Sequence, residues 1–566
     1  MKAGLSSDGK ARVKASRGLA VLFLLLTGIG VARIVSTYHV FSGTWDEVAH
    51  VATGMEWLQN GTYTLEPMHP PLARVAVALG PFLSGIRWDP RLGMWQGGNA
   101  ILAARNQYGH NLALARMGVL PFFMVGAFLA WRWTLARYGA IAAGAAALSF
   151  TTFPPILGHA ALATTDMAAA AGFTAALLSF IYWLEKPTAA RSAAFGAAAA
   201  LGTLCKFSVP IFLLASGAGL WLWRRILERR EGCTAAPLLL AGRGKIGIAA
   251  LAAMAALWSG YRFSLGSAAE SAQRPYGAID RLVGTRGWAH EAAYALVEAK
   301  CIPARPLIKG LAQVREKEER GEKSFLLGQV RSRGWWYFFP VALAVKTPIA
   351  GLILAAMGAA AALRLSWAGK NWILGAPPVA AAATLSIAML QNLSIGVRHV
   401  LPMYSLLAIM TGVGFQTLWR RAGGGRAMAR TAAAALLAWQ TIASARAHPD
   451  YLAYFNELAG RHPEKILITS DLDWGQDLLR LSSVLRERKI PFVSIAYSGA
   501  AELEHLQLPP FRALNPYERA TGWVAVGMMR RFTGGIGLPD DGFQWLSAYE
   551  PVELVGKSIL LYYIPD

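Results

Sequence analysis

The sequence predicts a polytopic α-helical membrane protein of about 11 transmembrane helices, with a small α/β domain at its C-terminal end. The composition is the first reason: 55% of the 566 residues are hydrophobic and 16% are charged, whereas about a quarter of a soluble domain is charged. The second is that apolar runs of about 20 residues, long enough to cross a bilayer core, recur along the chain. The third is a change of composition after residue 447, where shorter strand-like segments replace the long runs.

The first apolar run follows a basic segment and has no small-residue cleavage site before Tyr38, so we expect an uncleaved signal anchor. Residues 193–204 are short for a span, but another run follows directly, which indicates a pair with Lys206 at its outer turn. Lys346-Thr347-Pro348 interrupts a later span about two turns after its start. The expected spans are residues 18–37, 112–131, 140–157, 167–184, 193–204, 207–223, 246–261, 339–363, 372–390, 400–419 and 430–447.

The net charge of +22 is concentrated in the short segments that this arrangement places in the cytoplasm. These segments hold 21 basic and four acidic residues, which accounts for +17 of the total. Such a bias sets topology by the positive-inside rule. It therefore puts the N-terminus in the cytoplasm and the C-terminus outside, and it excludes nucleic acid as the partner that explains the charge.

Two outer segments, residues 38–111 and 262–334, belong to a predicted transmembrane domain that covers residues 1–447. Residues 47–59 and 72–83 have the spacing of amphipathic helices that lie in the membrane interface. Residues 448–566 form the predicted α/β domain on the outer face. The other predicted elements are a helix at 306–323, tail strands at 465–470, 492–497, 523–526 and 558–564, and a tail helix at 476–489.

The three cysteines do not form a recognisable framework. Cys205, Cys233 and Cys301 fall in a span, a cytoplasmic loop and an outer loop, respectively. Their positions predict no disulfide pairing and their spacing is not that of metal ligands. The sequence assigns no cofactor, and it leaves a divalent metal ion at the outer site open.

Acidic residues near the outer membrane boundary are the first candidates for a functional site. Asp46 and Glu47 directly follow the first span, where the alternative interpretation is a pair of solvated acids at the start of a helix. The rigid Pro70-Pro71 step holds His69 near the base of the same loop, and Asp166 occupies another outer turn. Several acids on one side of a membrane indicate a site that needs a base or a metal ion.

Cations at the outer ends of spans are the second group, because the positive-inside rule does not require them there. Lys206, Lys346, Arg398 and His399 occupy such positions. Each could be a snorkelling side chain, and for Lys206 that interpretation has at least equal weight. Arg398-His399 follows the polar turn QNLSIGV, and an Arg fork suits the phosphate of an anionic lipid.

Two charged motifs have less specific interpretations. Asp471-Leu-Asp473-Trp-Gly-Gln-Asp477 follows a predicted strand and precedes a helix, where α/β domains bind ligands and where Asp is also a preferred helix cap. We expect a cap for at least one of these acids. The run REKEERGEK, residues 315–323, is most simply a solvated helical face.

Together these motifs resemble a known family. Asp46-Glu47, HPPL at 69–72, the TTD turn ending at Asp166 and GVRHVLP at 396–402 are similar to the GT-C class of membrane glycosyltransferases. The resemblance is to the glycosyltransferase family 39 group, which contains protein O-mannosyltransferases and lipid A aminoarabinose transferases, and it covers residues 1–447. The stretches WWYFFPVALAVKTP, YLAYFNELAG and SDLDWGQDL resemble a bacterial subgroup of this family.

The resemblance implies roles for matching positions. It makes Asp46 the catalytic base, Glu47 its acidic partner, Asp166 the acid of the second outer loop and Arg398 a cation near the lipid phosphate. One position departs from the pattern, since some relatives carry Lys where this chain has His69. A contact of His69 with phosphate, metal ion or headgroup therefore stays open.

The resulting hypothesis is an inverting transferase in a bacterial inner membrane. It would move a sugar from a polyprenyl-phosphate donor to an unidentified protein, lipid or glycan acceptor on the outer face. Asp46 would accept the proton of the acceptor hydroxyl, and Arg398, with His399 or Lys346, would stabilise the departing phosphate. The alternatives are a transporter or flippase of a lipid-linked glycan, which predicts inverted repeats with broken helices, and a non-catalytic assembly protein.

Overall fold

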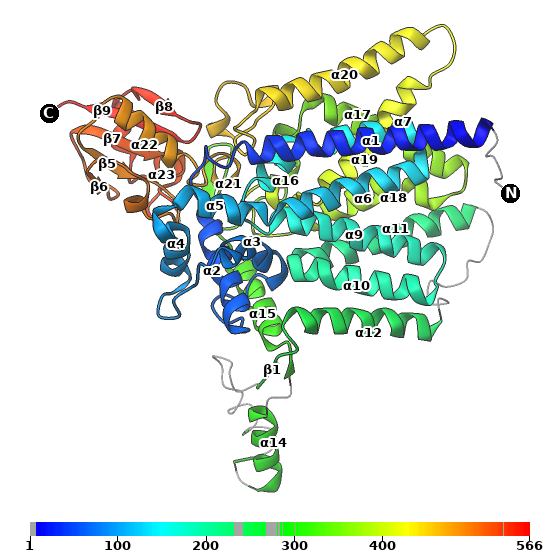
Figure 1. Ribbon diagram of the computed structural model, residues 1–566, viewed down its shortest axis with the longest axis horizontal. Helices are drawn as coiled ribbons and strands as arrows, with labels where there is room; N and C mark the ends of the chain where they lie inside the picture. Colours follow the sequence, from blue (N-terminus) through cyan, green and yellow to red (C-terminus); the bar gives the residue numbers. More distant parts are fainter. Residues whose placement is uncertain are drawn as a thin grey trace.

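The computed structural model of the chain describes residues 7–230, 242–267, 280, 284–285, 287–299, 302–535 and 537–566. A bundle of long helices forms one part of the molecule and a small sheet lies at the opposite end, with shorter helices between them (Figure 1). The two termini lie at opposite ends of the long axis. Cys233 and Cys301 lie outside the described residues, and Cys205 is a buried free thiol.

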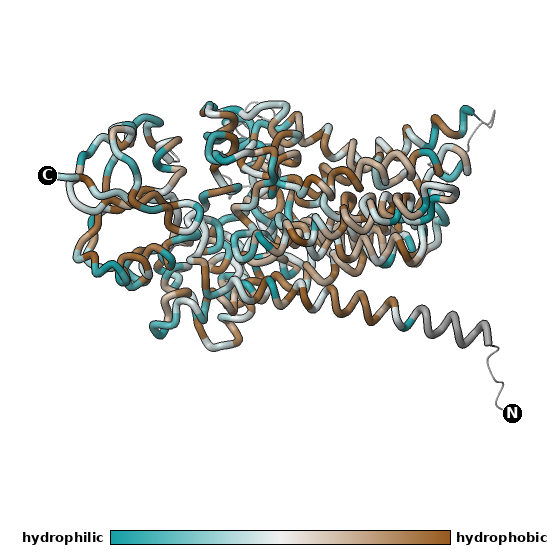
Figure 2. Tube along the Cα trace, turned by 90° about the horizontal axis from the view of Figure 1, so that it is seen from above, coloured by the Kyte–Doolittle hydropathy of each residue, from teal (hydrophilic) through white to brown (hydrophobic). Residues whose placement is uncertain are grey.

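The bundle contains the long helices, and hydrophobic residues dominate along them (Figure 2). These helices pack side by side with their axes along the length of the molecule. They are α1 (Ser7–Val35), α6 (Leu120–Tyr138), α7 (Ala140–Phe150), α9 (Asp166–Glu185), α10 (Ala189–Cys205), α11 (Ser208–Arg230), α12 (Arg243–Gly260), α17 (Ile349–Ala368), α18 (Ala376–Ala388), α19 (Met403–Trp419) and α20 (Arg426–Arg446).

Within the described part of the chain, four helical segments are long and apolar enough to cross a membrane, and one bent helix pair would make a fifth. The four are Arg17–Val35, Tyr108–Tyr138, Asp166–Glu185 and Ile349–Ala368. The protein is thus a helical membrane protein with several apolar helices, as predicted. The larger number of about 11 spans and the orientation of the termini stay predictions.

One of the predicted spans is sharply bent, and another has a short interruption within a continuous helical segment. Residues 140–157 form α7 and α8 (Pro154–Ala160), which meet at 56°, because Pro154 and Pro155 start a new helix and cannot continue the hydrogen bonds of the preceding one. Residues 112–131 divide at Gly118 between α5 (Tyr108–Met117) and α6. A β-carbon at Gly118 would lie 2.1 Å from the Ala76 carbonyl oxygen, so close packing requires glycine there.

The interruption predicted at residues 346–348 is present. There α16 (Phe338–Lys346) ends and α17 begins. The predicted pair around Lys206 is present as well, since α10 ends one residue before it and α11 starts two residues after it. Both breaks place a lysine at the end of the bundle that faces the sheet.

Short helices between the bundle and the sheet form the platform for the site. They are α2 (Trp45–Asn60), α3 (Pro71–Leu83), α4 (Met94–Ala103), α5 and α15 (Arg305–Arg320). Helix α14 (Trp288–Glu298) projects away from them at the edge of the molecule (Figure 1). Glu47 through Glu56 are all buried by protein, so this part of α2 has no exposed apolar face. The prediction that residues 47–59 lie in the membrane interface stays a prediction. A β-carbon at Gly54 would lie 2.0 Å from the Arg74 carbonyl oxygen, which shows how closely α2 packs on α3.

The C-terminal sheet has the strand order β6-β5-β7-β9-β8. Strand β5 pairs in parallel with β6 and β7, and β9 pairs antiparallel with β7 and β8. Helix α22 (Leu478–Glu487) packs on one face through Leu478, Leu481 and Leu485. The strands are β5 (Val493–Ala496), β6 (Phe511–Ala513), β7 (Gly522–Gly527), β8 (Glu553–Val555) and β9 (Ile559–Ile564). Two short two-stranded sheets lie outside this sheet, β1 (Leu265–Gly266) with β2 (Ile302–Pro303) and β3 (Ser324–Leu326) with β4 (Gln329–Arg331).

Three of the four predicted tail strands coincide with β5, β7 and β9, and the predicted tail helix coincides with α22. The strand predicted at 465–470 is wrong. The chain there forms a 3₁₀ turn (Pro463–Lys465) and the short helix α21 (Thr469–Leu472). Buried Leu467 and Ile468 gave the segment the pattern of a strand, but they fill space beside the bundle. The boundary at residue 447 and the outer position of the sheet stay predictions.

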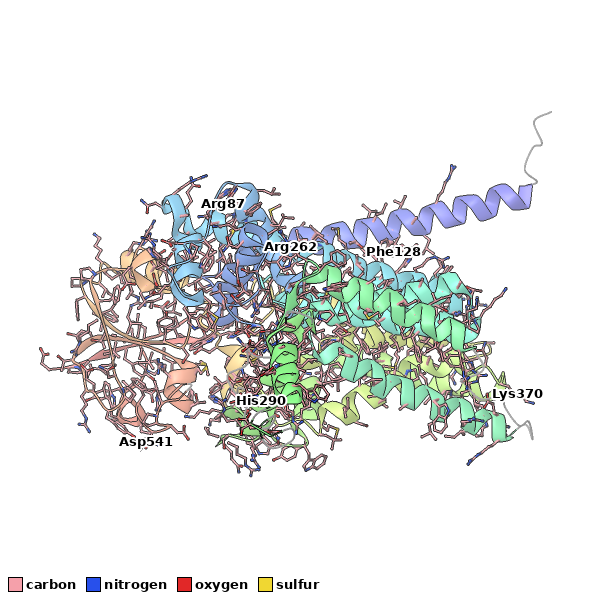
Figure 3. All side chains as sticks on the ribbon, turned by 90° about the horizontal axis from the view of Figure 1, so that it is seen from below. Arg87, Phe128, Arg262, His290, Lys370 and Asp541 are labelled. Carbon is pink, nitrogen blue, oxygen red and sulfur yellow. The ribbon has the colours of Figure 1, made fainter. Side chains whose placement is uncertain are left out.

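The ends of the molecule differ in chemistry. Figure 3 places Lys370 at the far end of the bundle and Asp541 in the sheet region. Arg262, which follows the last turn of α12, lies between the bundle and the platform helices, with its guanidinium 4.2 Å from the Trp57 ring. The candidate site lies at this junction.

Candidate functional site

A cavity of about 660 Å³ lies where α2, α11, α15 and the turn before α19 meet the sheet region. Its polar lining, called the polar wall below, includes Asp46, His69, Lys206, Arg398 and His399, and charged residues from α15 and the segment that follows it line the cavity as well. Its apolar lining includes several side chains that are also exposed on the surface. The apolar residues are Phe207, Pro210, Ile211, Leu311, Val314, Ile387, Leu390 and Leu393, of which Ile211, Leu311 and Leu390 are exposed.

A cluster of four charges forms the polar wall and the layer behind it. The Arg398 guanidinium donates to the Asp46 carboxylate at 2.5 Å and lies 3.8 Å from that of Asp166. The Lys206 ammonium donates to the other oxygen of Asp166 at 2.5 Å. Asp166 is buried behind these two cations and is not itself part of the cavity wall. The structure thus brings together residues that are up to 352 positions apart.

The environment of Asp46 keeps it ionised. Burial alone would raise its pKa, but Arg398, together with the neighbouring His50 and His69, outweighs burial and lowers the pKa to about 2. Burial lowers the pKa of His399 well below its usual value, so this ring is neutral. His399 stacks on Phe339 with ring centroids 6.4 Å apart. Of these two cavity groups, Asp46 is charged and His399 is not.

Lys206 is not a snorkelling side chain. It stands in the two-residue turn between α10 and α11, lines the cavity and is largely buried. Its ion pair with Asp166 holds the start of α9 against this turn. The position of Lys206 is therefore that of a cation directed into the site.

Glu47 does not line the cavity, and its expected role as the acidic partner of Asp46 in catalysis stays a prediction. Its carboxylate is fully buried and forms a two-point ion pair with Arg116, with both N–O distances 2.9 Å. It also accepts hydrogen bonds from the amides of Ala163 and Thr44. The bond to Thr44 caps the start of α2, so Glu47 fixes the position of its neighbour Asp46.

Arg116 is a positioning residue that the sequence analysis missed. Besides Glu47, it donates to the carbonyl oxygens of Tyr38, Phe41 and Ser42. A buried arginine inside a predicted span is a signal that could have identified it, because such a charge needs a partner. The pair ties the loop after α1 to the start of α2.

His69 is held by a second buried network. Its Nδ1 lies 3.0 Å from the Glu66 carboxylate and 3.2 Å from Arg74, and Arg74 also pairs with Glu66. The Arg74 Nε donates to Nδ1 of His50 at 2.9 Å, which places the proton of a neutral His50 on Nε2. These contacts orient both imidazoles beside Asp46.

Lys346 does not line the cavity, and its expected contact with the phosphate stays a prediction. Its ammonium is buried and donates to the carbonyl oxygens of Leu452 and Asp471, at 2.8 and 2.6 Å, and lies 4.1 Å from the Phe455 ring. The lysine thus fastens the segment after α20 to the end of α16. Its role is to hold the joint between the bundle and the sheet region.

Of the three aspartates of the SDLDWGQD motif, Asp471 contacts the turn before α19, and Asp473 and Asp477 bind groups within the C-terminal region. Asp471 accepts from the Val397 amide at 3.0 Å, next to Arg398. Asp473 accepts from the amides of Gly475 and Met529. Asp477 stands at the cap position of α22 but accepts from Lys557 and Ser558 instead of capping the helix. Trp474, between them, lies 4.2 Å from the Arg398 guanidinium and lines the cavity.

The charged run at 315–323 is only partly a solvated face. Arg315 and Glu319 form an exposed pair. Lys317 and Glu322, however, pair at 2.8 Å on the cavity side of α15, and Glu318 accepts from the Asn392 amide. Helix α15 thus closes one side of the cavity.

In the part of the chain that the structure describes, no group of three or more His, Cys, Asp or Glu side chains has the arrangement of a metal site. The histidines beside Asp46 face Arg74 and Glu66, as given above. The metal ion that the sequence left open therefore has no assigned ligands.

No family model matches this chain, and no curated protein matches it. Among solved structures it is similar to ArnT from Cupriavidus metallidurans bound to undecaprenyl phosphate, with 11% identity, a TM-score of 0.49 and coverage of 96% of this chain and 98% of that one. It is also similar to the archaeal oligosaccharyltransferase AglB from Archaeoglobus fulgidus, in complex with an inhibitory peptide and a dolichol-phosphate, with 12% identity, a TM-score of 0.48 and coverage of 94% and 72%. In both comparisons the identity is below 25% and the TM-score is below 0.5.

Proposed function

We propose that this chain is a membrane glycosyltransferase that transfers a sugar from a polyprenyl-phosphate donor to an acceptor at the outer face of a bacterial inner membrane. The observation that carries the proposal is the pairing of Asp46 with Arg398 in a cavity whose lining also includes apolar side chains that are exposed on the surface. A lipid-linked anionic donor needs both kinds of lining. The prenyl chain would lie along Ile211, Leu311 and Leu390, with the phosphate at Arg398 and Lys206.

In this reaction, the acceptor oxygen attacks the anomeric carbon while the bond from that carbon to the phosphate oxygen breaks, which inverts the anomeric centre. Asp46 accepts the proton that the acceptor hydroxyl loses. Arg398 and Lys206 stabilise the charge that grows on the departing phosphate. Asp166 holds both cations in place, and the network of Glu66 and Arg74 orients His69 at the edge of the same wall.

The bend between α7 and α8 is a broken helix, which is a feature that the transporter alternative predicts. The bend leads to the turn in which the Ala163 amide binds Glu47. It therefore also has a role in a transferase, because it supports the start of α2. An experiment on turnover has to separate the two functions.

The test begins with mass spectrometry of glycans and glycolipids from a deletion strain, which identifies the missing product and hence the donor and acceptor. Purified full-length protein in lipid nanodiscs is then assayed for transfer. Asp46→Asn removes the base but keeps the shape, so turnover should fall by about 10²–10⁴-fold. Asp89→Asn is the control, because Asp89 lies in the same outer segment and pairs with Arg91 at the surface. Near-normal turnover of Asp46→Asn, or movement of an intact donor across the bilayer without sugar transfer, would overturn the proposal.

A further inference from the structure

The charges around Arg398 already balance before any ligand binds. Two carboxylates, Asp46 and Asp166, face two cations, Arg398 and Lys206, within one largely buried cluster. A phosphate group that entered this cluster would add a negative charge without a free partner. Such an addition is costly where water is scarce, unless one of the carboxylates moves away.

Arg398 itself is held in place. Its guanidinium lies 4.2 Å from the Trp474 ring, and the amide of the preceding Val397 donates to Asp471. Its buried Nε has no hydrogen-bond partner among the described residues. An unpaired donor on a fixed guanidinium indicates a position where an anion can bind.

Of the two carboxylates, Asp46 is the one that can leave. Asp166 is 1% exposed and is bound directly to Lys206, whereas Asp46 is 22% exposed and lines the cavity. The Asp46 carboxylate also occupies Nη1 of Arg398, at 2.5 Å, on the face that meets the cavity. A ligand that approaches through the cavity therefore meets the Asp46–Arg398 pair.

Resting on the proposed function, we infer that Asp46 occupies the anion-binding position of Arg398 in the free protein, and that the donor phosphate must displace it. Exchange of this partner would leave Arg398 bound to phosphate and free the Asp46 carboxylate for the acceptor proton. A carboxylate paired with arginine is a poor base, so the protein without donor would not activate a hydroxyl or water. Donor binding would itself switch on the base.

The released carboxylate would face neutral or distant groups. The pKa values of His50 and His69 are lowered by burial, so neither ring replaces the charge of Arg398. The other charged groups packed around the cluster have partners of their own. They are Glu66 and Arg74, Lys317 and Glu322, and Lys346, which faces Asp471.

Binding of undecaprenyl phosphate to the full-length protein in nanodiscs tests this inference. If Asp46 competes for Arg398, Asp46→Asn should bind the lipid phosphate at least tenfold tighter than the native protein. Asp166→Asn is the matched control, because it removes the same charge at 3.8 Å from Arg398 without vacating the position on the cavity side. It should tighten binding much less. Asp89→Asn should leave the affinity unchanged.

If Asp46→Asn and Asp166→Asn bind undecaprenyl phosphate equally more tightly than the native protein, the effect is a general one of charge, and the exchange of Asp46 for phosphate at Arg398 is refuted. Unchanged or weaker binding of the lipid by Asp46→Asn would refute it as well. A second measurement covers a variant that fails to fold. In the native protein, the pH dependence of kcat reports the donor complex and that of kcat/KM reports the free protein. The acid limb of the kcat profile should therefore lie at higher pH than the acid limb of the kcat/KM profile. If the two limbs coincide, the exchange is refuted. If the native protein binds the lipid phosphate and transfers sugar, but shows neither the tighter binding of Asp46→Asn nor the separated acid limbs, only the exchange is refuted. If the native protein neither binds the lipid phosphate nor transfers sugar, the proposed function is refuted as well.

Discussion

Replacing Glu47 by Gln should unfold the protein more readily without changing any group that lines the cavity. The substitution keeps the size of the side chain but leaves the buried Arg116 without its counter-charge, and it places an amide donor beside guanidinium donors. Breaking one partner of a buried ion pair costs about 3–5 kcal/mol. That cost corresponds to a factor of about 10²–10⁴ in the ratio of folded to unfolded protein.

The assay is the thermal unfolding midpoint of the purified full-length protein, with transfer measured on the fraction that remains folded. Glu185→Gln is the matched control, because Glu185 also forms a two-point pair with an arginine, Arg137, but is 34% exposed. Loss of an exposed pair costs about 0–1 kcal/mol. The reasoning fails if Glu47→Gln melts like the native protein yet has lost transfer, since Glu47 would then act in catalysis.

Two further predictions concern pH and topology. Burial raises the pKa of Asp473 to about 7 despite the amides that donate to it, so the folded state holds a proton that the unfolded chain releases near pH 4. The thermal unfolding midpoint should therefore fall as pH rises from about 4 to 7 and level off above pH 7. An equally steep fall in the Asp473→Asn variant would exclude this residue as the cause. Reporter fusions at Gly232 and Asp566 should give cytoplasmic and outer signals, respectively, because basic residues cluster around Gly232. Matching signals from both fusions would contradict an odd number of spans.

The predictions made from the sequence succeeded where a local pattern decides the structure. Apolar length located the long helices, and Lys346-Thr347-Pro348 marked the break before α17. The same reasoning failed for residues 465–470, because burial beside the bundle gives a segment the apolar pattern of a strand without supplying a partner strand.

The candidate site shows the same division. Asp46, Asp166 and Arg398 could be selected because charges at a membrane boundary are rare, and the structure places them in one cluster. Their neighbours Glu47 and Lys346 belong to the same class of residue, yet they bind buried protein groups. The difference depends on partners such as Arg116 and Leu452, which lie far away in sequence and leave no local pattern.

The order in which the chain is made gives the Asp46–Arg398 contact a further consequence. The two residues are 352 positions apart, and Trp474, which contacts Arg398, comes later still. During synthesis, Asp46, Asp166 and Lys206 are therefore complete long before the arginine that the proposed reaction requires. Without Arg398, the cluster would hold two carboxylates and one cation, so the charge balance of the site depends on the late part of the chain.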